Sequence, residues 1–248
     1  MECSAFTHPG LVRPSNEDSF CLKELGESSA VLAVVADGMG GHEGGEIASR
    51  IAVSAIESVV TASWKTHLDP GACLSIVADG VAAANRLIQE ESIKRYGTRC
   101  MGTTVTAAVI HGNRVHLGHA GDSRAYLISR YGISQVTEDH SIVGEMMRDG
   151  NLTEAEAMRH PGRNILTNAL GTSDYPRLDL HTEALEQGDI VLLCTDGLTN
   201  LVSREEILGV ARGCPSLDVL VRSLVDLANA RGGYDNTTVV AVRFRDGG

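Results

Sequence analysis

The chain has 248 residues, with 32 acidic and 21 basic side chains, a formal net charge of −11 and a pI near 5.2. This acidic balance argues against a nucleic-acid partner, because binding to a phosphate backbone relies on a basic surface. No linker rich in proline, serine or glycine and no block of like charges divides the sequence. We therefore expect one domain spanning residues 1–248, with a substantial core.

In chain order, residues 31–36 form an apolar run typical of a buried strand. Apolar positions recur at helical spacing between residues 47 and 60 and again between 74 and 88, where Asp69-Pro70 marks a helix start. Two long amphipathic helices are therefore predicted. Four strands with very short connections follow, at residues 103–110, 114–120, 123–128 and 133–138. Connections too short for crossover helices predict an antiparallel meander.

The stretch from residue 141 to residue 170 reads as short helical pieces and loops, with Thr153 and Glu156 at capping-box spacing. An insertion of this kind between strands is a candidate flap. Beyond it we expect two strands, two helices and a closing strand, at residues 178–182, 189–195, 204–212, 217–230 and 236–244. Helices in two blocks around antiparallel strands predict an α+β sandwich and exclude a receiver domain, whose parallel strands alternate with helices.

The cysteine pattern and the absence of targeting signals bear on the compartment. Six cysteines are scattered without close pairing, and several lie in apolar runs, which favours a reducing compartment and no structural zinc. The N-terminus lacks the basic start and apolar core of a signal peptide. The longest purely apolar run, residues 30–36, is far shorter than the about 20 residues that span a bilayer. We expect a cytoplasmic monomer with no membrane segment in this chain.

Carboxylates stand at the tips of four apolar strands: Asp37, Asp122, Asp196 and Asp235. Three of them adjoin a glycine, and an Asp-Gly pair alone indicates a tight turn more often than a ligand. The flanking runs are strongly apolar, however, and an unpaired buried charge costs on the order of several kcal/mol. Because strands that end together bring their tips together, the set predicts a shared site for Mn²⁺ or Mg²⁺.

Segments spread over nearly the whole chain resemble the signature motifs of type 2C metal-dependent serine/threonine protein phosphatases of bacterial type. They are, in order, Arg13-Pro14-Ser15-Asn16-Glu17-Asp18, Asp37-Gly38-Met39-Gly40-Gly41-His42, Gly102-Thr103-Thr104, Gly121-Asp122-Ser123-Arg124, Asp196-Gly197-Leu198 and Asp235-Asn236. Their order and spacing together are very specific. The resemblance implies a sandwich of two antiparallel β-sheets flanked by α-helices, with a binuclear metal centre at one end.

The resemblance also assigns metal-binding roles. It makes Asp37 the carboxylate that bridges two ions, with the Gly38 carbonyl on one ion and Asp196 and Asp235 on the other. Asp122 would join Asp196 around a weaker third ion.

Three further positions take roles from the same motifs. Glu17 and Asp18 would act mainly through metal-bound waters, and an exposed strand start is the alternative for this acidic pair. Arg13 is the candidate phosphate ligand, because a guanidinium can hold two phosphate oxygens at once, although an isolated arginine usually lies along the surface. His160, in a segment typical of bacterial relatives, is expected to influence substrate access, with helix capping or packing against Pro161 as the alternative.

The expected chemistry follows from the charge of a phosphomonoester. Its dianion repels an anionic nucleophile, so cations must neutralise it, and a water shared by two ions loses a proton near neutral pH to become the attacking hydroxide. No Cys-x5-Arg phosphate loop occurs, which argues against a covalent enzyme intermediate. Many eukaryotic relatives carry a histidine after the Asp-Gly pair as general acid, whereas this chain has Met39 there. A metal-bound water or His42 would have to serve instead.

The predicted function is therefore hydrolysis of phosphoserine and phosphothreonine in proteins. The alternative is a pseudophosphatase that binds phosphoproteins without turnover, against which every metal-ligand position is filled. A hydrolase of small phosphoesters is a third reading that the same centre supports. By resemblance, a serine/threonine kinase and its targets are the expected partners.

Overall fold

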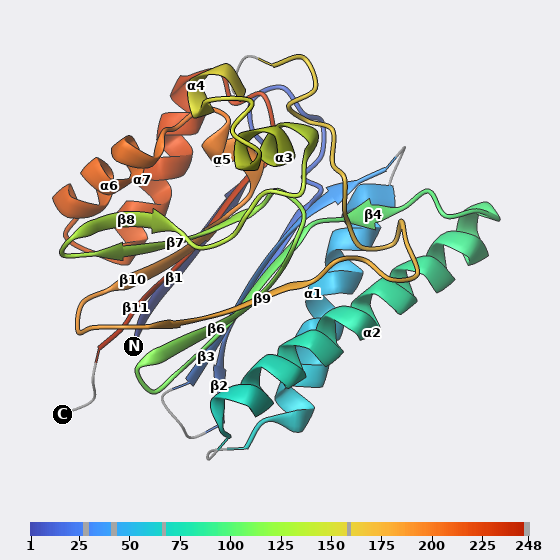
Figure 1. Ribbon diagram of the computed structural model, residues 1–248, viewed down its shortest axis with the longest axis horizontal. Coiled ribbons are helices and arrows are strands. Elements are labelled where there is room, and N and C mark those ends of the chain that lie inside the picture. Colours follow the sequence, from blue (N-terminus) through green and yellow to red (C-terminus); the bar gives the residue numbers. More distant parts are fainter. Residues whose placement is uncertain (27–29, 41–43, 66–67, 158–159, 246–248) are drawn as a thin grey trace.

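The computed structural model describes residues 1–26, 30–40, 44–65, 68–157 and 160–245. Two antiparallel β-sheets pack face to face in it, and helices cover their outer faces (Figure 1). This arrangement confirms the α+β sandwich expected from the sequence.

The two sheets are built from strands distant in sequence, and every pairing is antiparallel. The first sheet has the order β1 (Glu2–His8), β11 (Thr237–Arg243), β10 (Ile190–Cys194), β7 (Arg124–Ser129) and β8 (Gly132–Gln135). The second has the order β2 (Asp18–Leu25), β3 (Ala30–Met39), β5 (Val105–His111), β6 (Arg114–Ala120) and β9 (Asp179–Ala184), and β4 (Gly102–Thr103) pairs with the end of β3.

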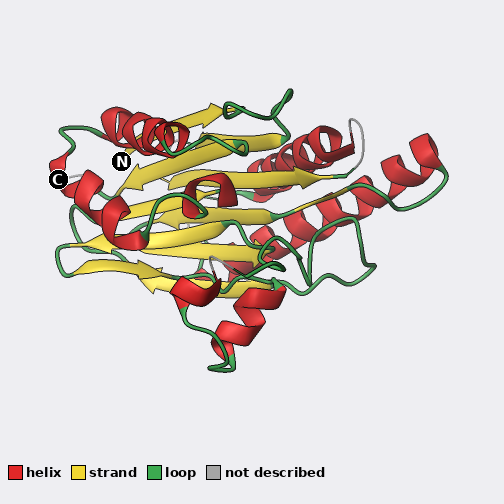
Figure 2. Ribbon diagram, turned by 90° about the horizontal axis from the view of Figure 1, so that it is seen from above, coloured by secondary structure: helices red, strands yellow, loops and turns green. Residues whose placement is uncertain are grey.

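Helices form two outer layers and a small group at one end. The long pair α1 (Gly44–Ser63) and α2 (Pro70–Tyr96) covers the second sheet, and α6 (Arg204–Gly213) and α7 (Leu217–Ala230) cover the first. Figure 2 shows these two groups on either side of the strands. The short helices α3 (Ile142–Arg148), α4 (Glu154–Ala157) and α5 (Asp196–Thr199) lie at the upper end of the sandwich in Figure 1.

Burial on both faces explains the continuous apolar runs in the central strands. Along β3, Val31 and Val35 pack into the core between the two sheets, whereas Leu32 and Val34 pack against α1 and α2. All four side chains are at most 3% exposed. Since successive residues of a strand face opposite sides, a strand with helices on one side and a sheet on the other has no polar face.

The helix α2 begins at the predicted position and is long and apolar enough to span a bilayer by length and composition. Asp69 is its N-cap and accepts a hydrogen bond from the Ala72 N–H, and Pro70 occupies the first turn. Val77 and Ile88 on its inner side are fully buried in the core that it shares with α1 and the second sheet. Core packing therefore accounts for the buried apolar residues of α2, whereas Leu87 and Ile93 are exposed.

The predicted four-strand meander is wrong as a single unit. β6 ends in the second sheet and β7 begins in the first, so the chain forms two hairpins, β5–β6 and β7–β8, in different sheets. Gly121 makes the crossing with a φ of 116°, and a Cβ at this position would lie 2.6 Å from the Cβ of Thr104. The crossing places Asp122 where the two sheets meet.

Residues 141–170 contain α3 and α4 joined by loops. The predicted capping box is confirmed, because Glu156 accepts a hydrogen bond from the Thr153 N–H (2.8 Å) and Thr153 Oγ1 accepts one from the Glu156 N–H (3.4 Å). The two ends of this segment meet, since Ser141 forms an isolated β-bridge with Leu166.

Candidate metal centre and active site

Five aspartates from both sheets converge at one end of the sandwich: Asp18, Asp37, Asp122, Asp196 and Asp235. Asp18 starts β2 and lies directly opposite Asp37 of β3 in the antiparallel register. Asp196 follows β10 and opens α5, and Asp235 precedes β11. Segments far apart in sequence thus bring these carboxylates to one end of the sandwich, and their role as metal ligands stays a prediction.

A cleft of about 540 Å³ opens over this end of the sandwich. Its lining includes most of the residues predicted for the site: Arg13, Glu17, Asp37, Gly38, Asp122, Asp196 and Asp235. Met39 lines the cleft as well, with Asn164, Ile165 and Leu166 from the segment 141–170. Asp18 lies beneath the cleft and His160 is not among its lining residues.

The backbone of Asp37 is held by the threonine pair of the Gly102-Thr103-Thr104 segment. The Asp37 N–H donates to Thr104 Oγ1 (3.0 Å), and the Asp37 carbonyl accepts from the Thr104 N–H (2.9 Å) and from Thr103 Oγ1 (2.8 Å). Thr104 Oγ1 is itself hydrogen-bonded to Ser123 Oγ (2.7 Å). These contacts leave the carboxylate of Asp37 available to the cleft and explain the place of this segment in the sequence pattern.

Gly38 is required by close backbone packing. A Cβ at this residue would lie 2.1 Å from the carbonyl oxygen of Gly45 and 2.6 Å from that of Glu17. The Gly38 N–H also donates to the Glu17 carbonyl (3.2 Å). Close packing where β2, β3 and α1 meet therefore requires a glycine after Asp37. This requirement is independent of any role of the Gly38 carbonyl as a metal ligand.

Asp18 is buried, so the expected alternative of an exposed strand start is wrong for this residue. Its Oδ2 accepts hydrogen bonds from Thr195 Oγ1 (2.9 Å) and Thr238 Oγ1 (2.7 Å), whereas its buried Oδ1 has no hydrogen-bond partner among the described residues. Burial raises the pKa of Asp18 to about 7, and the nearby charge of Asp196 acts in the same direction. A buried carboxylate oxygen without a donor fits a site that is completed by a cation.

Asp37, Asp122 and Asp196 are also destabilised in their ionised form. Burial, followed by the charges of Asp18 and Asp196, raises the pKa of Asp37 well above its usual value. The pKa of Asp196 is raised by burial and by the charge of Asp235, and that of Asp122 by burial and by Asp196. Such a group of like charges is stabilised by divalent cations, which favour the ionised form of each carboxyl.

Arg13 lies at the edge of the cleft and forms an ion pair with Asp235. Its Nη2 donates to Asp235 Oδ2 (2.7 Å), and its side chain is 53% exposed. Arg13 therefore lies beside the carboxylates and lines the cleft, and its phosphate-binding role stays a prediction.

Asn236 anchors the segment that carries Arg13 and Glu17, a role that sequence reasoning missed. Its Oδ1 accepts the Glu17 N–H (2.7 Å), and its Nδ2 donates to the carbonyls of Pro9 (2.9 Å) and Ser15 (2.8 Å). The only sequence signal was its place after Asp235 in the motif pattern. Contacts between residues more than 200 positions apart cannot be read from spacing.

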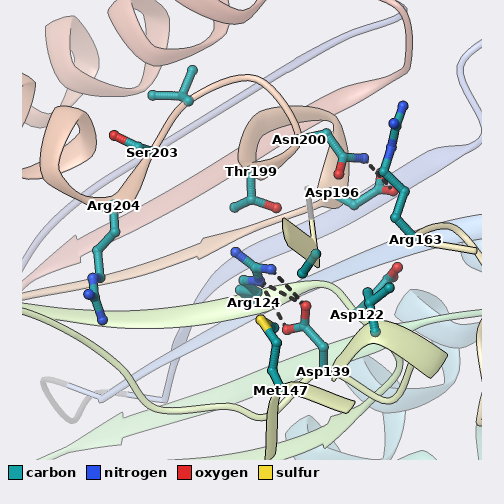
Figure 3. A pocket seen from close by; sticks show the side chains of 13 residues that line it. Asp122, Arg124, Asp139, Met147, Arg163, Asp196, Thr199, Asn200, Ser203 and Arg204 are labelled. Carbon is teal, nitrogen blue, oxygen red and sulfur yellow. Dashed lines mark hydrogen bonds and ion pairs between the residues drawn. The ribbon is translucent and has the colours of Figure 1, made fainter. Parts of the chain in front are cut away.

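A second, smaller pocket next to the carboxylates is lined by residues of both α3 and α5 (Figure 3). Asn200 donates to Asp196 Oδ2 (3.0 Å) there and orients that carboxylate. On the opposite wall, Arg124 makes a bidentate ion pair with Asp139, through Nε to Oδ1 (2.9 Å) and Nη2 to Oδ2 (2.7 Å). Both partners are mostly buried, so this pair fixes the start of β7 next to Asp122.

The donor set suits Mn²⁺ or Mg²⁺, which prefer carboxylate and carbonyl oxygens. In the part of the chain that the structure describes, no three acidic, histidine or cysteine side chains already close around one point. Ions would therefore have to draw the carboxylates together. The unpartnered oxygen of Asp18 and the mutual repulsion around Asp37 both favour that movement.

His160, which was predicted to influence substrate access, does not line the cleft. His160 Nδ1 accepts the N–H of Gly162 (3.1 Å) in its own loop, so its role in substrate access stays a prediction. His42 lies outside the described residues. His116 and His119 extend from β6 to different partners, Thr182 Oγ1 (3.1 Å) and the Glu138 carbonyl (3.0 Å).

A two-sheet sandwich with a carboxylate cluster at one end defines a class of metal-dependent phosphoester hydrolases. The sequence profile of protein phosphatase 2C matches residues 14–232. The chain therefore belongs to the protein phosphatase 2C family.

Known proteins of the same kind resemble the chain over its whole length. It is 36% identical over 251 residues to "Protein phosphatase PhpP" of Streptococcus pneumoniae, which covers 99% of this chain and 98% of the relative. The Mycobacterium tuberculosis serine/threonine phosphatase PstP/Ppp superposes with a TM-score of 0.88 at 34% identity, covering 99% of both chains. A structure of the PstP catalytic domain in complex with 2 manganese ions gives a TM-score of 0.84 at 34% identity, covering 99% of this chain and 98% of that one.

Proposed function

We propose that this protein is a metal-dependent protein phosphatase that hydrolyses phosphoserine and phosphothreonine. The observation that carries the proposal is the group of five carboxylates from both sheets, one of which has a buried oxygen that no described residue hydrogen-bonds. Burial raises the pKa of Asp18, Asp37, Asp122 and Asp196. Divalent cations would stabilise these carboxylates in their ionised form and neutralise a phosphate dianion beside them. The family membership and the serine/threonine phosphatases among its relatives support the same function.

We infer that two Mn²⁺ or Mg²⁺ ions form the core of the site. Asp37 would bridge them, with the Gly38 carbonyl on one ion and Asp196 and Asp235 on the other. Asp122 would hold a third ion with Asp196. When bound, the ions neutralise the phosphate and lower the pKa of a water that they share.

The protein side chains around the ions would hold the metal-binding carboxylates and orient the phosphate. Asn200 fixes Asp196 by a hydrogen bond, and the two threonine hydroxyls fix Asp18, so neither carboxylate rotates freely. Arg13 would hold two phosphate oxygens and keep the phosphorus in line for attack. Its guanidinium pairs with Asp235 at the edge of the cleft (2.7 Å).

The setting of the site suggests how a protein substrate would reach it. Residues 141–170 contribute Ile165 and Leu166 to the lining of the cleft, which supports a flap role for this segment within one catalytic domain. The six cysteines are free thiols, which fits a cytoplasmic protein acting on phosphoproteins such as a serine/threonine kinase and its targets.

The test is release of phosphate from a phosphothreonine peptide with Mn²⁺, with and without a chelator. Wild-type protein should release phosphate only with the metal, and Asp196→Ala should not release it. Asp226→Ala, which removes an exposed carboxylate on α7, is the matched control and should retain full activity. Absence of turnover in folded, Mn²⁺-loaded wild type would favour the pseudophosphatase, and turnover of small phosphoesters alone would favour the small-molecule hydrolase.

A further inference from the structure

His140 is a fully buried residue that forms two hydrogen bonds with the turn next to Asp122. Its backbone N–H donates to the Gly121 carbonyl (2.7 Å), and its Nδ1 accepts the Gly121 N–H (3.2 Å). Its side chain is 1% exposed. No other residue in the described ranges bonds both polar groups of the Gly121 backbone, so His140 sets the direction in which Asp122 leaves β6.

The hydrogen bonds around His140 determine its tautomer. Asn168 Oδ1 accepts the Arg177 N–H (2.9 Å), which fixes the orientation of the amide and leaves Asn168 Nδ2 to donate to His140 Nδ1 (2.9 Å). With two N–H donors aimed at it, Nδ1 must be the unprotonated nitrogen. The proton is then on Nε2, which donates to Asp179 Oδ2 (3.0 Å).

Asp179 is held in turn by an arginine. Arg177 Nε donates to Asp179 Oδ1 (2.8 Å) and Arg177 Nη2 to Oδ2 (2.7 Å), so the carboxylate that orients His140 is itself fixed. The ring of His119 packs against the ring of His140, with centroids 4.9 Å apart. Neither ring can turn without breaking these contacts.

His140 also joins the Asp122 turn to the segment that overhangs the cleft. The His140 carbonyl accepts the Thr167 N–H (2.9 Å), and Asn168 bonds its ring. Immediately before these residues, Ile165 and Leu166 line the cleft. Asp139, the residue before His140, accepts hydrogen bonds from Arg124 on the other side of Asp122 (Figure 3). Two successive residues thus hold the chain on both sides of Asp122.

We propose that His140, held in one tautomer by Asp179, is the positioning residue for Asp122 and thereby sets the affinity of the Asp122 metal site. The inference rests on the proposed function only in assigning Asp122 as a metal ligand. His140 itself does not contact the ion or the substrate. It acts through the Gly121-Asp122 turn, as partners behind metal ligands commonly do.

The test is titration of the metal-free protein with Mn²⁺ by calorimetry. His140→Gln keeps a donor near the position of Nε2 but loses the acceptor near Nδ1, and should weaken the Asp122-dependent site about 10- to 100-fold while leaving the tighter ions unchanged. His140→Asn keeps an acceptor near Nδ1 and should stay within about threefold of wild type. His116→Asn is the matched control, because His116 is buried like His140 but lies on β6 and bonds β9 through Thr182.

A double substitution separates positioning from general loosening of the fold. In an Asp122→Asn background, His140→Gln should cause no further loss of Mn²⁺ affinity, since the side chain through which it acts is gone. Equal losses from His140→Gln and His140→Asn, a loss that persists in the Asp122→Asn background, or wild-type protein without an Asp122-dependent ion would each overturn the proposal. Calorimetry measures Mn²⁺ affinity and needs no turnover. An inactive wild type would therefore contradict the proposed function, whereas the role of His140 would still be decided by the Mn²⁺ titrations.

Discussion

Replacing Asp18 by asparagine should stabilise the metal-free protein at pH 8 and destabilise the metal-bound one. The new side-chain amide would present its carbonyl oxygen to the hydroxyls of Thr195 and Thr238, which now donate to Asp18 Oδ2. The substitution removes a buried negative charge near Asp196 and Asp37. It also removes the oxygen that has no hydrogen-bond partner and that would face the cation side of the site.

The magnitude follows from the pKa of Asp18. Raising that pKa from 3.8 to about 7 costs the ionised folded form about 4 kcal/mol. The new amide N–H₂ takes the place of the unpartnered Oδ1 and, if it stays unpaired, costs about 1–3 kcal/mol. The metal-free variant should therefore be more stable than wild type by about 1–3 kcal/mol at pH 8.

The stability difference between the variant and the wild type should grow as the pH rises. Between pH 3.8 and about 7, folded Asp18 binds a proton that the unfolded chain has released, so this residue lowers the free energy of unfolding as the pH rises. The advantage of the variant should therefore be largest at pH 8 and should vanish near pH 5.5. Urea unfolding in chelator at both pH values measures the difference in the free energy of unfolding. With Mn²⁺ in place of chelator, the wild type should be the more stable of the two proteins.

Two outcomes would refute this reasoning. One is a metal-free variant less stable than wild type at pH 8. The other is a stability difference that is the same at pH 5.5 and pH 8, since a change independent of pH cannot come from the ionisation of Asp18.

Three further substitutions test other parts of the site. Arg13→Ala should chiefly raise KM for a phosphopeptide, because Arg13 is assigned to holding phosphate, and a fall in kcat at unchanged KM would assign it to the transition state instead. Asn236→Ala removes three hydrogen bonds and should lower the free energy of unfolding by about 2–4 kcal/mol in urea, with a loss under about 0.5 kcal/mol contradicting the anchor role. Gly38→Ala places a Cβ 2.1 Å from the Gly45 carbonyl and should abolish Mn²⁺ binding in calorimetry, whereas Gly209→Ala, with nothing within 4 Å, should not change it.

The sequence predicted best those elements whose periodicity and end signals agree. The last helix was expected at residues 217–230 and is found there, with Ser216 as N-cap and its apolar positions buried. β1 was missed because every residue along Glu2–His8 is half-buried, which leaves no alternation to detect. The split of the meander was missed because a short turn at Gly121 looks the same whether the next strand pairs with the last one or enters another sheet.

The carboxylate site was predictable because its signal is local to each strand. Asp37 and Asp196 each follow an apolar run, and they come together because their strands end at the same end of the sandwich. The residues that hold them were not predictable in this way. Asn236 and His140 act across gaps in the sequence, and a buried asparagine or histidine has many structural uses.

The same burial that makes the carboxylates costly makes them effective ligands. Apolar strands on either side withdraw Asp18 and Asp37 from water, which raises the pKa of each and weakens the metal-free fold. Within that environment the attraction between a carboxylate and a divalent cation is also stronger, because less solvent screens it. The free energy stored by repulsion around Asp37 is thus released when ions bind, so metal affinity and metal-free stability should vary in opposite directions across substitutions of these carboxylates.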